Sequence, residues 1–156
     1  MKREKATFAA GCFWGVEGAF ANLSGVLATQ VGYTGGAMEN PSYEDVCTGT
    51  TGHAESVQVE YDADQISYRA LLEHFFSVHD PTTLNRQGPD VGSQYRSAIF
   101  YHEEGQRRCA EEIMHRLQAS LSKRMVTQLV PAGPFYPAEE YHQGYLAKRG
   151  LSFCHI

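Results

Sequence analysis

The chain has 156 residues, of which 42% are hydrophobic, and it carries a formal net charge of −5. This length suits one compact domain with a single core, so we expect residues 1–156 to form a single domain. A negative net charge gives no basic field for nucleic acid, and no apolar run approaches the roughly 18 to 20 residues that span a bilayer. We therefore expect a soluble, cytoplasmic monomer that binds neither nucleic acid nor membranes.

The first chemical feature follows a short apolar strand predicted over residues 6–10. Residues 11–15 read Gly-Cys-Phe-Trp-Gly, and a helix is predicted over residues 16–23. Cys12 would then stand at or just before the helix N-terminus, where unpaired N–H groups and the helix dipole stabilise an anion. Such settings lower the pKa of a thiol from about 8.5, so the spacing predicts a reactive Cys12. The alternative is a small apolar cysteine packed in a core.

Strands and helices follow in mixed order after a turn at residues 22–25. The predicted strands span residues 26–33, 55–61, 96–101 and 126–130. One predicted helix follows the capping residue Ser67. Two others are predicted over residues 103–122 and 138–145. Long irregular loops are predicted over residues 35–52 and 81–95. Residues 146–156 are expected to form a mobile C-terminal tail.

This order of elements favours an α+β fold, a two-layer sandwich with long irregular loops. The strand over residues 55–61 alternates between apolar and polar side chains, which is typical of an antiparallel sheet with one helix-free face. A doubly wound parallel sheet is the alternative. The chain has no glycine-rich phosphate loop of the kinds that accompany that fold.

Polar groups in and beside the two long loops would gather near Cys12 if both loops reach the same end of the sheet. These groups are Tyr43, His53, Glu55, Asp90 and Tyr95. A sulfur nucleophile, a carboxylic acid and two phenols suit attack on a polarised atom whose oxygen is protonated as it leaves. The alternatives are an exposed strand-end carboxylate for Glu55 and core or rim aromatics for the tyrosines.

The four cysteines, Cys12, Cys47, Cys109 and Cys154, include no CxxC pair. Structural zinc is therefore not expected. A disulfide scaffold is not expected either, because a chain of this length and apolar content does not need covalent cross-links. Cys109 falls on the helix predicted over residues 103–122 and is interpreted as a packing residue. Cys47 lies in a polar loop near the other reactive groups, and Cys154 lies in the tail.

Three motifs together resemble one family. Residues 11–15 (Gly-Cys-Phe-Trp-Gly), 52–55 (Gly-His-Ala-Glu) and 92–97 (Gly-Ser-Gln-Tyr-Arg-Ser) are similar, in sequence and interval, to those of the A-type peptide methionine sulfoxide reductases. The resemblance extends from about residue 6 to about residue 145. It implies an α/β sandwich with a ferredoxin-like core, acting as a single catalytic domain without cofactor or metal.

The resemblance also implies catalytic roles. Cys12 would attack the sulfoxide sulfur and keep the oxygen as a sulfenic acid, releasing methionine. Glu55, with a pKa raised by partial desolvation, would be the protonated group that hydrogen-bonds the sulfoxide oxygen. Tyr43 and Tyr95 would assist it.

Four further residues would bind the substrate. Phe13 and Trp14 would hold the S-methyl group, with sulfur–aromatic contacts of roughly 0.3 to 1.5 kcal/mol each. Asp90 would order the pocket and the substrate backbone, and His53 would support Glu55. Because the sulfoxide sulfur is a stereocentre, such a pocket accepts one epimer, the S form in this family. Free, peptide-bound and protein-bound methionine sulfoxide are all expected substrates, and the sequence does not rank them.

A second thiol is needed to clear the sulfenic acid as a disulfide. Cys154 resembles the C-terminal recycling cysteine of many family members, which implies a Cys12–Cys154 disulfide reduced by thioredoxin. Cys47 is the alternative resolving thiol because it lies close in sequence to the predicted pocket. Only one cysteine follows Cys109, so a relay through two tail cysteines is not available.

Two other function classes stay open at this point. In a cysteine–histidine acyl hydrolase, Cys12 would pair with His53 or another histidine and would turn over esters or amides without an external reductant. A metal-binding interaction module would use the cysteines and the seven histidines, although their spacing is scattered.

Overall fold

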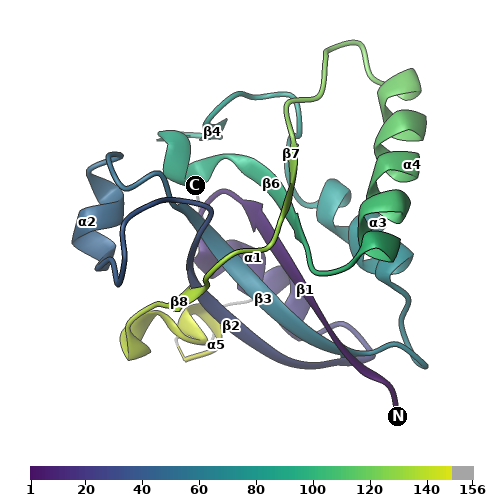
Figure 1. The fold of residues 1–156 in the computed structure, drawn as a ribbon, viewed down its shortest axis with the longest axis horizontal. Helices are drawn as coiled ribbons and strands as arrows, with labels where there is room; N and C mark the ends of the chain where they lie inside the picture. The colour runs from purple at the N-terminus through teal and green to yellow at the C-terminus, as the bar shows by residue number, and fades with distance from the viewer. Residues whose placement is uncertain (149–156) are drawn as a thin grey trace.

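The computed structural model describes residues 1–148, which fold around a six-stranded sheet (Figure 1). Its strands are β1 (Arg3–Ala10), β2 (Val26–Thr34), β3 (Ala54–Asp62), β6 (Ser97–Tyr101), β7 (Gln128–Pro131) and β8 (Tyr136–Pro137). They lie in the order β7-β6-β1-β3-β2-β8. Strands β6 and β7 run parallel, whereas the other neighbouring pairs are antiparallel. The alternative of a doubly wound parallel sheet is therefore wrong.

Helices connect and cover these strands. They are α1 (Phe13–Ala21), α2 (Tyr43–Cys47), α3 (Tyr68–Ser77), α4 (Glu104–Ser120) and α5 (Tyr145–Lys148), with 3-10 turns η1 (Ser93–Tyr95) and η2 (Glu140–His142). Two short strands, β4 (Arg86–Gln87) and β5 (Asp90–Val91), pair as a separate hairpin. Ser67 caps α3 as predicted, because its Oγ accepts a hydrogen bond from the Ala70 N–H at 3.0 Å. The predicted α+β fold is confirmed, with helices packed on a central mixed sheet.

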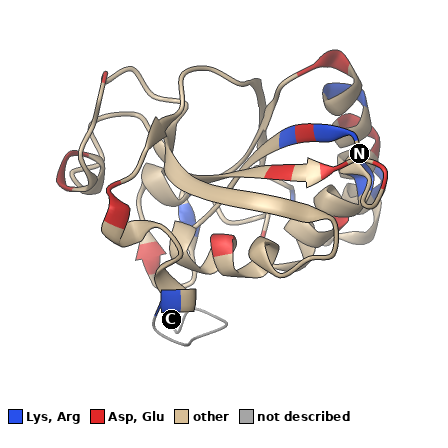
Figure 2. Cartoon of the chain, turned by 90° about the horizontal axis from the view of Figure 1, so that it is seen from below, with Lys and Arg blue, Asp and Glu red and all other residues tan. Residues whose placement is uncertain are grey.

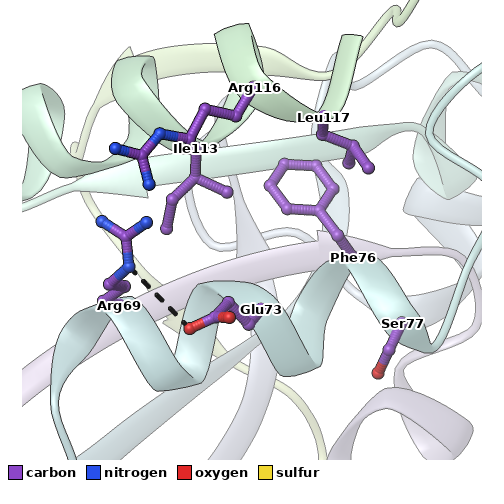
Figure 3. Close-up of a pocket in the computed structure, with 7 residues that line it drawn as sticks. All are labelled: Arg69, Glu73, Phe76, Ser77, Ile113, Arg116 and Leu117. Carbon is purple, nitrogen blue, oxygen red and sulfur yellow. Dashed lines mark ion pairs between the residues drawn. The ribbon is translucent and has the colours of Figure 1, made fainter. Parts of the chain in front are cut away.

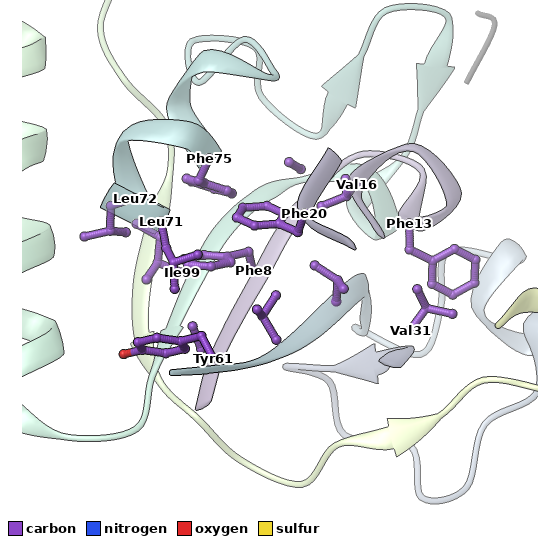
Figure 4. Close-up of a cluster of buried hydrophobic side chains, with 14 of the residues drawn as sticks. Phe8, Phe13, Val16, Phe20, Val31, Tyr61, Leu71, Leu72, Phe75 and Ile99 are labelled. Atoms are coloured by element: carbon purple, nitrogen blue, oxygen red, sulfur yellow. The ribbon is translucent and has the colours of Figure 1, made fainter. Parts of the chain in front are cut away.

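The main core packs one face of the sheet against α1, α3 and α4 (Figure 4). Phe8 of β1 is its centre, with ring centroids 5.2 Å from Phe20 and 5.0 Å from Phe75. Successive strand residues point to opposite faces, so Ala9 joins a smaller cluster with Phe100 on the other face. Truncating a buried ring such as Phe8 to alanine costs about 3 to 5 kcal/mol of folding free energy.

The long loop predicted over residues 35–52 is interrupted by α2. This helix begins with a reciprocal cap: Ser42 Oγ accepts from the Asp45 N–H at 3.1 Å, and Asp45 Oδ2 accepts from the Ser42 N–H at 3.0 Å. The helix spans five residues. A helix of this length is too short to show apolar periodicity in the sequence, so the pattern alone predicted only a loop.

The helix predicted over residues 138–145 forms instead as two separate pieces, η2 and α5. Gly144 lies between them with φ of 61°, a left-handed conformation that ends a helical turn. Residues 146–148, the start of the predicted tail, belong to α5, and Leu146 is buried. Residues 149–156, which include Cys154, lie outside the described residues.

Figure 2 marks the acidic and basic residues along the chain, which occur on helices, strands and loops. On α4, Arg107 pairs with Glu104 and Glu111 along one side of the helix. The short α2 carries the acidic Glu44 and Asp45 in its first turn and no basic residue. In the part of the chain that the structure describes, no helix is long and apolar enough to cross a membrane.

Candidate active site

Cys12 stands between β1 and α1. It is the N-cap residue of α1, its carbonyl oxygen accepts from the Val16 N–H at 3.3 Å, and its side chain is half-buried. Gly11 makes the turn from strand to helix with φ of 98°, and a Cβ at that position would lie 2.9 Å from the Cβ of Gln87. The predicted strand-to-helix position is confirmed, so the thiol lies at the positive end of the helix dipole.

Glu55, the second residue of β3, is 1% exposed. The Phe13 N–H donates to its Oε1 at 3.2 Å, which ties the carboxyl to the residue after Cys12. Its Oε2 has no hydrogen-bond partner among the described residues. Burial raises the pKa of Glu55 to about 8, the Phe13 hydrogen bond opposes the rise, and the charge of Asp90 adds to it. At neutral pH Glu55 therefore holds a proton, in a carboxyl with one buried oxygen left unpaired.

Two phenols share the surroundings of this carboxyl. Tyr43 is the first residue of α2 and Tyr95 the last of η1, and both are half-buried. Burial raises the pKa of both above the ordinary 10.0, and the charge of Glu55 raises it further. The other groups whose charge acts on Tyr95 are Asp90, Cys47 and Cys12. Both phenols therefore remain hydrogen-bond donors in a site that brings together a thiol and two carboxyls.

The two aromatic residues after Cys12 are not equivalent. Phe13 is fully buried, and its ring lies against Tyr33 and Tyr43, with centroids 5.7 Å and 6.3 Å away. Trp14 is half-buried, and its indole stacks on Tyr145 with centroids 3.7 Å apart. Phe13 thus supports the Tyr43 ring from inside, whereas Trp14 keeps a surface that a ligand can touch.

Asp90 reaches the site on the β4–β5 hairpin. It pairs with Gln87 across that hairpin, and Gln87 in turn approaches the Gly11 turn before Cys12. Asp90 is half-buried, and burial raises the pKa of its carboxyl. The hairpin therefore carries Asp90 to the same end of the sheet as Cys12 and Glu55.

His53 contacts the backbone of residues 36–38, which follow β2. It is 1% exposed, its Nδ1 accepts from the Gly36 N–H at 3.0 Å, and its Nε2 donates to the Met38 carbonyl at 2.6 Å. Because backbone groups occupy both ring nitrogens, His53 is not available as the base that an acyl hydrolase needs beside Cys12. Its contacts hold the backbone of residues 36–38.

The other thiols differ in their surroundings. Cys47, at the end of α2, is exposed, and its side chain hydrogen-bonds that of Tyr43. Partial burial raises the pKa of the Cys47 thiol, and the Tyr43 hydrogen bond opposes the rise. Cys109 is half-buried on α4 and packs against the main core, in agreement with its interpretation as a packing residue. Residues 1–148 contain no group of three or more His, Cys, Asp or Glu side chains placed to hold a metal ion.

A hollow of about 450 Å³ lies between α3 and α4 (Figure 3). Phe76 and Leu117 contribute apolar walls, and Arg69 on the rim pairs with Glu73 at 4.0 Å. Neither helix carries any of the predicted site residues. The reactive groups therefore lie elsewhere, around the N-terminus of α1.

A sequence model of the family described as "Peptide methionine sulfoxide reductase" matches residues 4–156. The chain belongs to this family. One relative, the peptide methionine sulfoxide reductase MsrA of Methanothermobacter thermautotrophicus, is 61% identical over 155 residues, which cover 98% of this chain and 92% of the relative.

Solved structures share the fold of this chain. The reduced form of Mxr1 from Saccharomyces cerevisiae matches with a TM-score of 0.92 at 38% identity, covering 98% of this chain and 89% of that one. Mxr1 in complex with Trx2 matches with a TM-score of 0.66 at 29% identity, covering 92% of this chain and 85% of that one. The sheet and helices described above are therefore shared with these solved structures.

Two residues of this family member lie at the site but were not predicted. Glu139 accepts hydrogen bonds from the Tyr33 hydroxyl at 2.8 Å and from the Tyr43 N–H at 3.0 Å. His142 is fully buried and accepts one from the Trp14 indole N–H at 2.9 Å. Their partners Tyr33 and Trp14 precede them by 106 and 128 positions, so no local pattern in the sequence signals these contacts.

Proposed function

We propose that this chain reduces methionine S-sulfoxide, free or within peptides and proteins, to methionine, with Cys12 as the nucleophile. One observation carries the proposal. The protonated, buried Glu55 has an unpaired carboxyl oxygen and is tied by a hydrogen bond to the residue that follows Cys12. Membership of the peptide methionine sulfoxide reductase family supports the choice of substrate.

In the first step the substrate oxygen passes to Cys12. The thiolate attacks the sulfoxide sulfur while the oxygen takes a proton from Glu55, and the hydroxyls of Tyr43 and Tyr95 donate hydrogen bonds to the same oxygen. The oxygen ends on the Cys12 sulfur as a sulfenic acid, and the substrate leaves as methionine. The substrate sulfur gains two electrons, which the Cys12 sulfur loses.

Specificity follows from two fixed ends of the site. The sulfoxide oxygen lies toward Glu55, and the S-methyl group lies against the open face of Trp14. With both substituents placed, only one configuration at sulfur leaves the rest of the substrate pointing to solvent, and the S epimer is the one proposed. Asp90 orders the substrate backbone, while Phe13 and His53 hold the surrounding structure in place.

In the second step a resolving thiol condenses with the sulfenic acid. The thiol replaces the hydroxyl, water leaves, and a disulfide forms, which an external dithiol then reduces by exchange. Cys154 is the proposed resolving residue, and Cys47 is the alternative because it hydrogen-bonds Tyr43 beside the site. Thioredoxin is the proposed reductant. The structure of Mxr1 in complex with Trx2 supports this choice.

The experiment compares the unchanged chain with Cys12→Ser, using methionine S-sulfoxide, with and without dithiothreitol. The unchanged chain is expected to form about one methionine per chain without dithiothreitol and many with it, and Cys12→Ser to form none. Cys109→Ser is the matched control and should behave as the unchanged chain. Methionine formation by Cys12→Ser, or turnover of esters without any reductant, would overturn the proposal.

A further inference from the structure

The orientation of the Trp14 indole is set from a distant part of the chain. Its Nε1–H donates to Nδ1 of His142, 128 positions later, at 2.9 Å. An indole N–H can only donate, so Nδ1 must be unprotonated and the hydrogen of the neutral imidazole must sit on Nε2. Burial lowers the pKa of His142, and the charge of Glu139 opposes the fall, which favours this neutral ring.

The other ring nitrogen of His142 has no such use. His142 is 0% exposed, and its Nε2 has no hydrogen-bond partner among the described residues. A buried N–H without a partner destabilises the fold, so an apolar ring of the same shape would suit stability better. What histidine provides at this position, and phenylalanine would not, is the Nδ1 atom that accepts a hydrogen bond from the Trp14 N–H.

His142 also contacts the phenol side of the site. Its ring centroid lies 4.4 Å from that of Tyr43 and 5.2 Å from that of Phe13. One imidazole therefore borders three side chains that the proposed function uses: it binds Trp14 by a hydrogen bond and packs against the two rings.

The segment that carries His142 is held firmly. Gln143 accepts from the Val31 N–H and donates to the Val31 carbonyl, both at 2.9 Å, which attaches the segment to β2. The Gly144 N–H donates to Glu17 of α1 at 2.8 Å. A histidine on such a fixed backbone can impose an orientation on its partner, because its own position does not adapt.

We infer that His142 is a positioning residue, whose unprotonated Nδ1 holds the Trp14 indole in the orientation that receives the S-methyl group of the substrate. The inference rests on the proposed function only for the identity of the substrate. The hydrogen bond and its effect on the indole can be measured without any turnover.

Two substitutions separate the acceptor from the ring. His142→Phe keeps an aromatic ring and removes the acceptor, whereas His142→Asn places an amide oxygen near the position of Nδ1 and removes the ring. Trp14 is the only tryptophan in the chain, so the near-ultraviolet circular dichroism of the indole reports on this residue alone. Thermal unfolding midpoints show that each variant is folded before it is compared.

His142→Phe is expected to weaken the indole band and to raise KM for methionine S-sulfoxide about two- to tenfold with kcat nearly unchanged, which is the range for one hydrogen bond. His142→Asn should keep most of the band and stay closer to the unchanged KM. An unaltered band and KM in His142→Phe would overturn the inference. Equal losses in both variants would overturn it too, because they would mean that ring packing alone matters.

A double-mutant cycle serves where His142→Phe is too unstable for kinetics. His142→Leu removes the acceptor and Trp14→Phe removes the N–H, so His142→Leu should raise KM less in the Trp14→Phe background than in the unchanged chain. Equal effects in the two backgrounds would overturn the inference. If the unchanged chain does not reduce methionine sulfoxide, the proposed function fails, while the circular dichroism of the His142 variants still decides whether Nδ1 orients the indole.

Discussion

The backbone N–H of Phe13 donates a hydrogen bond to Oε1 of Glu55 at 3.2 Å. This contact joins the first turn of α1 to the start of β3, 42 positions further along the chain. It places a buried acid beside the residue that follows Cys12 and leaves Oε2 for a ligand. The N-terminus of α1, where Cys12 stands, is therefore also attached to the buried carboxyl of Glu55.

Glu55→Gln should lower kcat/KM for methionine S-sulfoxide by roughly 10² to 10⁴, the usual contribution of a general acid. In the unchanged chain, kcat/KM should fall as pH rises through about 8, because Glu55 with a pKa of about 8 loses its proton. Tyr43 and Tyr95 do not explain such a fall, since burial raises their pKa above 10.0.

The pH profile of Glu55→Gln is the matched measurement. The alkaline fall near pH 8 should be absent in this variant, because glutamine does not titrate. A fall of the same size and position in both proteins would assign the titration to another group.

Glu55 should also make folding stability depend on pH. Its pKa is raised from 4.5 to about 8 in the folded chain, so between these values the folded state holds a proton that the unfolded state has lost. The contribution of Glu55 to the free energy of unfolding is complete below pH 4.5. It falls by up to about 1.4 kcal/mol per pH unit as pH rises from 4.5 to about 8, and it levels off at higher pH. Urea unfolding of the unchanged chain and Glu55→Gln, under reducing conditions, measures the difference. A pH-independent difference would contradict the prediction.

The two phenols should contribute separately to the reduction step. Tyr43→Phe and Tyr95→Phe should each lower kcat about tenfold, since one donor to the developing oxygen is lost while Glu55 and the other phenol remain. The double variant should lose about 10² or more. Tyr101→Phe, at the end of β6 and outside the site, is the control and should stay within about twofold. Single variants with unchanged kcat would remove the phenols from the mechanism.

The placement of Cys12 was predictable because it depends on neighbours in sequence: an apolar strand, a glycine turn and a helix follow one another over residues 3–21. The helix α2 and the two-residue strand β8 were not, since neither is long enough to show a period. Short elements of this kind form because distant groups hold them. The Gly32–Pro137 pairing that makes β8 joins residues 105 positions apart.

The same reason explains which site residues were missed. Glu139 and His142 act on Tyr33 and Trp14, which precede them by 106 and 128 positions. No local pattern signals such a contact. His53, in contrast, was singled out by a motif, and the structure shows its ring engaged with the backbone of Gly36 and Met38.

Glu139→Gln should destabilise the fold by about 1 to 2 kcal/mol. The carboxylate accepts from the Tyr33 hydroxyl and the Tyr43 N–H, and hydrogen bonds to a charged acceptor contribute more than neutral ones. Glu140→Gln is the matched control, because that neighbouring side chain is 90% exposed and forms a surface ion pair with Lys148; it should change stability by less than about 0.5 kcal/mol. Urea unfolding compares the two, and equal effects would contradict the role given to Glu139.

The central claim is that Cys12 takes the sulfoxide oxygen. Intact mass after one equivalent of methionine S-sulfoxide, without reductant, tests it most directly. The unchanged chain should lose about two mass units as a disulfide forms, and Cys154→Ser should instead gain one oxygen. Loss of two mass units in Cys154→Ser would assign the resolving role to Cys47. No mass change in the unchanged chain, or the same change in Cys12→Ser, would contradict the account.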